Sequence, residues 1–143
     1  MRFVLAAVVT FVAALFWLDV IGLQIARAED VSAQVTHAAT RHGIPPRLAH
    51  AIVRVESGYR CQARNGNARG IGQVFPRTAA SVGVYGNLFD CATGLEASMR
   101  YLRAALMAGG SGCAGVSLYN LGIYARPRCT AYGRRVMALA ARG

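Results

Sequence analysis

The apolar positions after residue 30 recur with helical spacing in one segment after another. From Val31 to Arg41 they fall three and four positions apart, which is typical of a helix with one buried face. A second helix is predicted to begin at Pro45-Pro46, because proline suits the first turn of a helix. It should end near Ser57-Gly58, because glycine commonly follows a helix.

The rest of the chain continues this helical pattern, with one interruption. Residues 59–72 are rich in glycine and asparagine and predict a loop. No segment alternates convincingly between polar and apolar residues, as a strand would. The sequence therefore predicts a compact, mainly α domain, with further helices over residues 76–80, 93–107, 114–121 and 130–141.

The first 28 residues have the pattern of a secretory signal peptide. Arg2 precedes an apolar run from Phe3 to Leu18, and Ala26-Arg27-Ala28 offers a small-x-small cleavage site. Cleavage there leaves a single domain over residues 29–143, periplasmic or secreted. The alternative is an uncleaved membrane anchor, which needs ~20 apolar residues, whereas Asp19 interrupts this run.

The positive charge of the chain is carried by arginine alone. The formal net charge is +10, and it is +9 without the two arginines and one aspartate of the predicted leader. Such a charge favours anionic partners. A nucleic-acid binder would gather its basic residues on a recognition helix or arm. These arginines are scattered, so we do not expect nucleic acid as a partner.

The cysteines predict disulfides. Cys61, Cys91, Cys113 and Cys129 all follow the predicted leader, and an even number in an exported protein is typical of disulfides. They lack the paired C-x-x-C spacing of zinc sites, so we expect no metal. Nearness in sequence favours the pairs Cys61–Cys91 and Cys113–Cys129.

Glu56 is the main candidate for chemistry. It lies at the end of a strongly apolar helix, where the helix dipole and an apolar pocket would both disfavour its ionised form. A carboxyl that stays protonated near neutral pH can act as a general acid. A single glutamate at a helix end is more often a solvated surface residue, so this argument needs support from neighbouring motifs.

That support comes from four segments in a fixed order. They are Glu56-Ser57-Gly58-Tyr59, the run from Ala68 to Ala79, Leu118-Tyr119-Asn120, and Tyr132. Together they resemble the lytic transglycosylases of the soluble SLT-domain type, which are relatives of goose-type lysozyme. The resemblance extends over residues 31–139 and implies a lysozyme-like helical fold.

The resemblance also implies a role for each matching residue. The catalytic acid and base corresponds to Glu56, and no cofactor is implied. The other residues would bind the substrate or arrange the site. Ser57 would fix the helix end and the carboxyl, Gln73 would line the sugar groove, and Tyr119, Asn120 and Tyr132 would lie beside the carboxyl.

The chain departs from the family pattern at several positions. Gly72 stands where the family usually has methionine, Ser98 where glycine is common, and Leu118 where alanine precedes the tyrosine–asparagine pair. None of these departures removes the catalytic acid.

The implied reaction cleaves the glycan strands of peptidoglycan between N-acetylmuramic acid and N-acetylglucosamine, leaving 1,6-anhydro ends. Most glycosidases need two carboxyl groups. The remaining carboxylates have structural explanations: Glu29-Asp30 at the new N-terminus, Asp90 as a helix cap and Glu96 in the first helical turn. A lone acid therefore suits a substrate that supplies its own nucleophile.

Two other functions stay open. One is a lysozyme-like hydrolase, and the other is a non-catalytic wall-binding component of a secretion or conjugation system. The expected partner is the peptidoglycan strand, with an envelope-spanning secretion or conjugation apparatus as a further candidate, and we expect the protein to act as a monomer.

Overall fold

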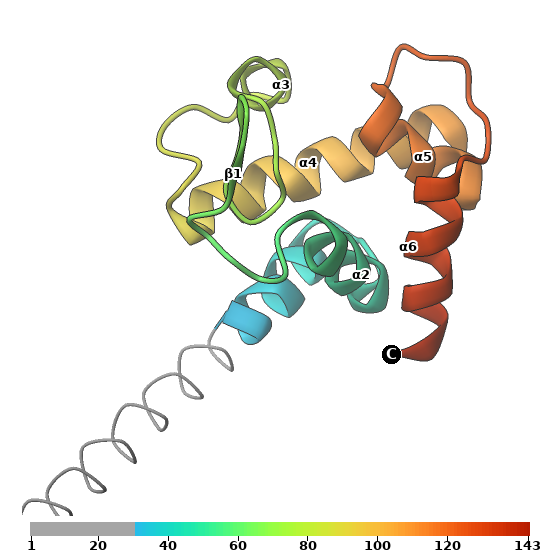
Figure 1. Cartoon of the computed structure of the whole chain (residues 1–143), viewed down its shortest axis with the longest axis horizontal. Coiled ribbons are helices and arrows are strands. Elements are labelled where there is room, and N and C mark those ends of the chain that lie inside the picture. The colour runs from blue at the N-terminus through green and yellow to red at the C-terminus, as the bar shows by residue number, and fades with distance from the viewer. Residues whose placement is uncertain (1–30) are drawn as a thin grey trace, which may run out of the picture. The chain divides into compact units, whose positions relative to one another are not determined.

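The helices predicted after residue 30 are present in the computed structural model, which describes residues 31–143 (Figure 1). The predicted signal peptide and its cleavage site lie outside the described residues. Within the described part, no helix is both long and apolar enough to cross a membrane. Residues 31–41 are helical, and the named helices are α2 (Pro46–Glu56), α3 (Pro76–Ser81), α4 (Cys91–Gly109), α5 (Cys113–Leu121) and α6 (Ala131–Arg142).

The ends of α2 follow from its sequence. Pro46 occupies the first turn, where its missing N–H leaves no hydrogen bond unmade. The helix ends at Glu56, and Gly58 then adopts a φ of +60°, a left-handed conformation that glycine adopts without strain. Glu56 is therefore the last helical residue, at the negative end of the helix dipole.

The start of α4 is set by Asp90, as predicted. Its carboxylate accepts a hydrogen bond from the backbone N–H of Thr93, 2.9 Å away. The helix begins at Cys91, two residues before the predicted start, so Glu96 lies in the second turn and not in the first. Glu96 instead binds Arg41, His42 and Arg100, which ties the first helix to α4.

The helices pack in pairs around one core. α2 packs against α6, α4 packs against both α3 and α5, and α5 packs against α6. In Figure 1, α4 passes behind the hairpin segment toward α5, and α2 lies between the hairpin segment and α6. Side chains from all of the longer helices meet in the interior, and the fully buried ones include Ile52, Leu95, Met99, Leu102, Leu118 and Val136.

The predicted loop over residues 59–72 contains a small antiparallel hairpin. β1 (Arg64–Asn65) pairs with β2 (Ala68–Arg69), and Arg69 forms a further bridge with Val74. The sequence did not reveal these strands because two residues are too few to show an alternating pattern. The hairpin matters for function because it forms one side of the cleft described below.

The structure contains the disulfides Cys61–Cys91 and Cys113–Cys129, which is the pairing that nearness in sequence favoured. The first joins the loop after α2 to the start of α4. The second joins the start of α5 to the segment before α6. In a domain of this size, a bridge contributes roughly 2–4 kcal/mol to stability.

Candidate active site

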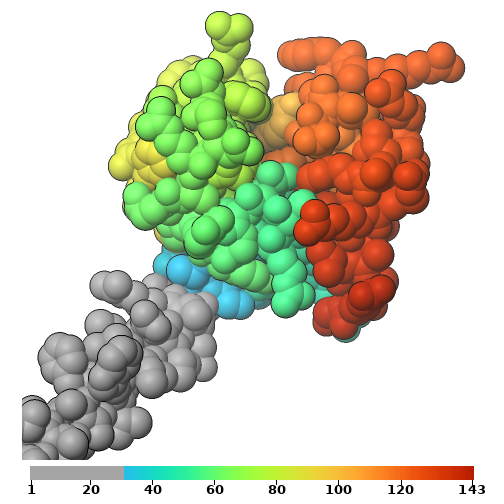
Figure 2. Space-filling view, viewed as in Figure 1, coloured from blue at the N-terminus to red at the C-terminus, as the bar shows by residue number. Residues whose placement is uncertain are grey.

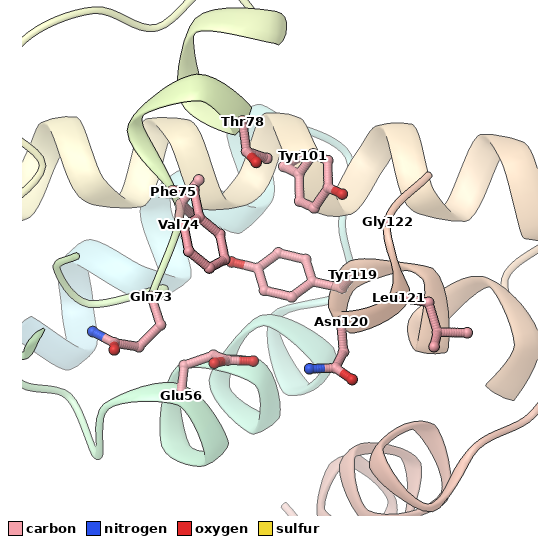
Figure 3. A pocket seen from close by; sticks show the side chains of 10 residues that line it. All are labelled: Glu56, Gln73, Val74, Phe75, Thr78, Tyr101, Tyr119, Asn120, Leu121 and Gly122. Atoms are coloured by element: carbon pink, nitrogen blue, oxygen red, sulfur yellow. The ribbon is translucent and has the colours of Figure 1, made fainter. Parts of the chain in front are cut away.

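A cleft opens between the hairpin segment and the segment around α5 and α6. Figure 2 shows it as a hollow between residues of about 60–85 and the C-terminal part, with α2 at its base. The cavity at its centre has a volume of about 250 Å³. Its lining includes Glu56 from α2, Gln73 and Phe75 from the turn before α3, Tyr101 from α4, and Tyr119 and Asn120 from α5 (Figure 3).

Glu56 is bound by a tyrosine from the other end of the chain. The Tyr132 hydroxyl, at the start of α6, donates to Glu56 Oε1 over 2.5 Å, and the two residues are 76 positions apart. Burial raises the pKa of Glu56 above its ordinary value, and the hydrogen bond from Tyr132 partly opposes this shift. The pKa of Tyr132 is itself raised, first by burial and then by the Glu56 charge, so this phenol keeps its proton and donates.

Several contacts hold Tyr132 in place. Thr130 caps α6 by accepting from the Gly133 N–H, and the Thr130 hydroxyl and backbone N–H both contact Ser117 Oγ at 3.0 Å. Ser117 in turn donates to the carbonyl of Cys113, which is in the second disulfide. The bridge and this network fix the start of α6, and with it the hydroxyl that reaches Glu56.

Ser57 lies below the cleft surface. Its side chain is 2 % exposed, donates to the carbonyl of Ile71 over 2.7 Å and accepts from the Arg60 N–H. Such burial does not suit direct contact with a substrate. The contacts join the end of α2 to the turn that carries Gln73, which suits the role of fixing the carboxyl's position.

Gln73 lies beside Glu56 but is also part of the turn itself. Its φ is +49°, a left-handed conformation that costs a residue with a side chain roughly 1–2 kcal/mol. The amide group offsets this cost by donating to the carbonyls of Ala63 and Gly70, at 3.0 and 2.9 Å. With both amide hydrogens committed, Gln73 can offer a ligand only its carbonyl oxygen.

Two departures from the family pattern meet in space. Gly72 lies against Ser98, and a Cβ at Gly72 would overlap the Ser98 side chain and come within 2.9 Å of the Tyr119 hydroxyl. Tyr119 donates to the Gly72 carbonyl over 2.8 Å, so Ser98 must donate to Tyr119, also over 2.8 Å. The small residue at 72 and the larger one at 98 therefore compensate each other, and both support Tyr119.

A second cavity adjoins the first at Glu56. It has a volume of about 650 Å³ and runs along the hairpin, past Arg64 and Asn65. Glu56 and Asn120 line both cavities, as do Gln73 and Phe75. Figure 3 shows the Glu56 carboxyl between Gln73 on one side and Asn120 on the other. The carboxyl therefore lies part-way along a groove and not at its end.

The other carboxylates of residues 31–143 line neither cavity. Asp90 is exposed and caps α4, where the Thr93 hydrogen bonds lower its pKa. Glu96 is held by arginine and histidine side chains. Its burial alone would raise its pKa, but hydrogen bonds from His42 and Arg100 and their positive charges lower the pKa overall. Within the described residues, Glu56 is therefore the one carboxyl group of the cleft.

The cleft contains aromatic residues to which the sequence had assigned no role. Phe75 is 52 % exposed and lies in the walls of both cavities. Tyr101 lines the central cavity, and its ring lies 5.4 Å from that of Tyr119. Phe75 belongs to the matched turn, so its place after Gln73 was the signal.

Comparison with known families agrees with this geometry. The model of the transglycosylase SLT domain matches residues 34–135. The chain belongs to this family. No solved structure gave a significant match. The SLT domain is found in transglycosylase-type enzymes that act on peptidoglycan, so peptidoglycan is the implied substrate. The family resemblance that the sequence motifs indicated is therefore confirmed.

Proposed function

We propose that this SLT-domain protein is a lytic transglycosylase in which Glu56 acts first as the acid and then as the base. The observation that carries the proposal is a single, partly buried carboxyl group, hydrogen-bonded to Tyr132, at the centre of a groove. Its raised pKa supports a protonated resting state. The family match supports the substrate class.

The proposed reaction needs one carboxyl group because the substrate provides the nucleophile. Glu56 donates its proton to the glycosidic oxygen between N-acetylmuramic acid and N-acetylglucosamine, and the bond from that oxygen to the muramic C1 breaks. The C6 hydroxyl of the same muramic residue then bonds to C1, and its proton passes to Glu56. This closes a 1,6-anhydro ring, consumes no water and returns Glu56 to its starting state.

Neighbouring residues would orient the acid and the strand. Tyr132 holds one carboxyl oxygen, so the other is the one positioned to protonate the substrate. Asn120 is exposed beside it and can hydrogen-bond a sugar, and Phe75 offers a surface for a sugar ring. The groove on both sides of Glu56 has room for strand residues on either side of the scissile bond.

The proposal includes an extracytoplasmic site of action. Peptidoglycan lies outside the cytoplasm, and the predicted signal peptide over residues 1–28 would deliver the domain there. The charge of +9 after cleavage suits an anionic wall, because opposite charges raise the local concentration of the partner. Service to an envelope-spanning secretion or conjugation apparatus is part of this proposal.

The product distinguishes this reaction from hydrolysis. Purified sacculi digested with the protein should release fragments with 1,6-anhydro-muramic ends, which mass spectrometry detects as lighter by one water than hydrolysed ends. Fragments that carry the added water would instead indicate a lysozyme-like hydrolase. Binding to sacculi without release of fragments would favour the wall-binding alternative.

The substitution Tyr132→Phe should shift the pH profile to higher pH. Cleavage requires protonated Glu56, so activity falls as the pH rises through the Glu56 pKa. Removing the hydrogen bond takes away an effect that lowers this pKa, so the pKa rises further and the alkaline limb moves up. We also expect kcat at the optimum to fall roughly tenfold, which corresponds to one hydrogen bond to a charged group.

The exposed residue Tyr85 provides the matched control for that variant. It is 77 % exposed and lines neither of the two cavities beside Glu56. Tyr85→Phe should therefore leave both the pH profile and kcat unchanged. An alkaline limb that stays in place in Tyr132→Phe would contradict the proposed contact with the catalytic proton.

A further inference from the structure

A third cavity shares Phe75 with the two cavities beside Glu56. It has a volume of about 450 Å³, and its lining residues include two arginines, Arg69 from β2 and Arg77 from α3. Asn67 and Thr78 add further polar side chains. No acidic residue of the described chain lines it, so the cavity is cationic without an internal counter-charge.

One of these guanidinium groups has an unused donor. The Nε–H of Arg69 is buried and has no hydrogen-bond partner among the described residues. Buried polar groups in folded proteins are nearly always paired, so an unpaired one needs an explanation, such as an ordered water, an ion or a ligand beside it. Neither Arg69 nor Arg77 forms an ion pair in residues 31–143, where Glu96 takes part in every salt bridge.

The cationic cavity adjoins the catalytic groove. Phe75 and Thr78 line both this cavity and the central one beside Glu56. Asn67 and Phe75 line both it and the cavity along the hairpin. A group attached to a strand in the groove could therefore reach past Phe75 to the two arginines.

We propose that Arg69 and Arg77 form a subsite for a free carboxylate of the peptide stem carried by the glycan strand. This inference rests on the proposed function, because it takes the strand to lie in the groove beside Glu56. The guanidinium fork matches a carboxylate in geometry and in charge, and two such groups bind it more strongly than neutral donors. The protein then prefers strands whose stems keep their free carboxylates over strands whose stems are amidated.

The test compares two substrates that differ only in this charge. One is a preparation of glycan strands with free stem carboxylates, and the other is the same preparation with those carboxylates converted to primary amides. For the wild type we expect kcat/KM to be about tenfold higher on the carboxylate strands, the effect of charge-assisted hydrogen bonds in a partly exposed site. Arg69→Gln and Arg77→Gln should each reduce this preference, and the double variant should abolish it.

An exposed arginine on α4 provides the matched control. Arg103 forms no side-chain hydrogen bond or ion pair within the described residues, so its replacement by glutamine breaks no contact. It also lines none of the three cavities. Arg103→Gln removes the same charge and should keep the wild-type preference. Thermal melting of every variant checks that the fold is intact; Arg77 is exposed, so its replacement should leave the melting temperature unchanged.

Binding to the inactive Glu56→Gln variant separates this inference from the proposed function. If no strand is cleaved, the proposed function fails, but a tighter dissociation constant for carboxylate than for amidated muropeptides still supports the subsite. Equal affinity for the two would overturn it. A preference that survives in the double arginine variant would overturn it as well, and so would competition by inorganic phosphate without any carboxylate preference.

Discussion

Replacing Glu56 with glutamine should abolish the clearing of a peptidoglycan gel. Glutamine keeps the shape of the side chain and can still accept a hydrogen bond from Tyr132, but it has no proton to give and cannot act as a base. A general acid contributes 10²–10⁴-fold to a rate, and Glu56 is proposed to act in both halves of the reaction. We therefore expect kcat to fall by about a thousandfold or more.

The same substitution should stabilise the fold above acidic pH, which separates loss of chemistry from loss of structure. The pKa of Glu56 is raised in the folded state by burial. Below the ordinary pKa of 4.5 the carboxyl is protonated in both states and costs nothing. As the pH rises to the folded-state pKa, the unfolded chain ionises more readily, and the wild type loses stability. Glu56→Gln should avoid this loss, and melting curves across the pH range would show it.

Asp90 provides a carboxylate-to-amide control for this experiment. It caps α4 on the surface, and asparagine is an equally good cap. Asp90→Asn should therefore keep both the fold and the cleavage activity. Substantial cleavage by Glu56→Gln would contradict the assignment of the acid, and so would equal losses in the two variants.

The helices could be predicted from the sequence because their signals are local. Pro46, Gly58 and Asp90 set helix ends through their own backbone or side chain, and each lies within a few residues of the end it determines. The short hairpin escaped prediction because two-residue strands carry no periodicity. Its pairing depends on the turn around it and on the Arg69–Val74 bridge.

The site could be predicted only in part, because its roles depend on contacts between distant segments. The resemblance to SLT-type enzymes indicated Ser57 and Gln73, but not that one is buried and that the other supports a turn through its amide. Glu56 and Tyr132 are brought together by the packing of α2 against α6. In the sequence, Gly72 and Ser98 are separate departures from the family pattern, and only the fold shows that they touch.

This contact predicts a large effect for Gly72→Ala. The φ of Gly72 is not left-handed, so the cost should come from crowding and not from backbone strain. The added methyl group would overlap Ser98 and press on the Tyr119 hydroxyl, and both of these residues are buried. Overpacking of this kind costs about 1–3 kcal/mol. Because Tyr119 lines the cleft, cleavage should fall together with the melting temperature.

A second substitution at Ser98 should partly reverse that loss. Ser98→Gly alone should also destabilise, since it removes a hydrogen bond to Tyr119 and places glycine inside α4. In the double variant the space left by the Ser98 side chain admits the new methyl group. The double variant should therefore lose less stability than the sum of the two single losses, by ~1 kcal/mol or more. The remaining approach to Tyr119, at 2.9 Å, makes full recovery unexpected.

Ser98→Ala provides the sharper control, because it removes the hydroxyl but keeps the Cβ that also lies within the overlap. It should fail to rescue Gly72→Ala, whereas Ser98→Gly should succeed. Chemical denaturation of the wild type and the single and double variants measures this difference. Additive losses in the Gly72→Ala/Ser98→Gly pair would mean that the two departures from the family pattern arose independently of their contact. If Ser98→Gly rescues Gly72→Ala and Ser98→Ala does not, the two departures compensate each other in size. The family has a large residue at 72 and a small one at 98, and this chain has the reverse, both beside Tyr119.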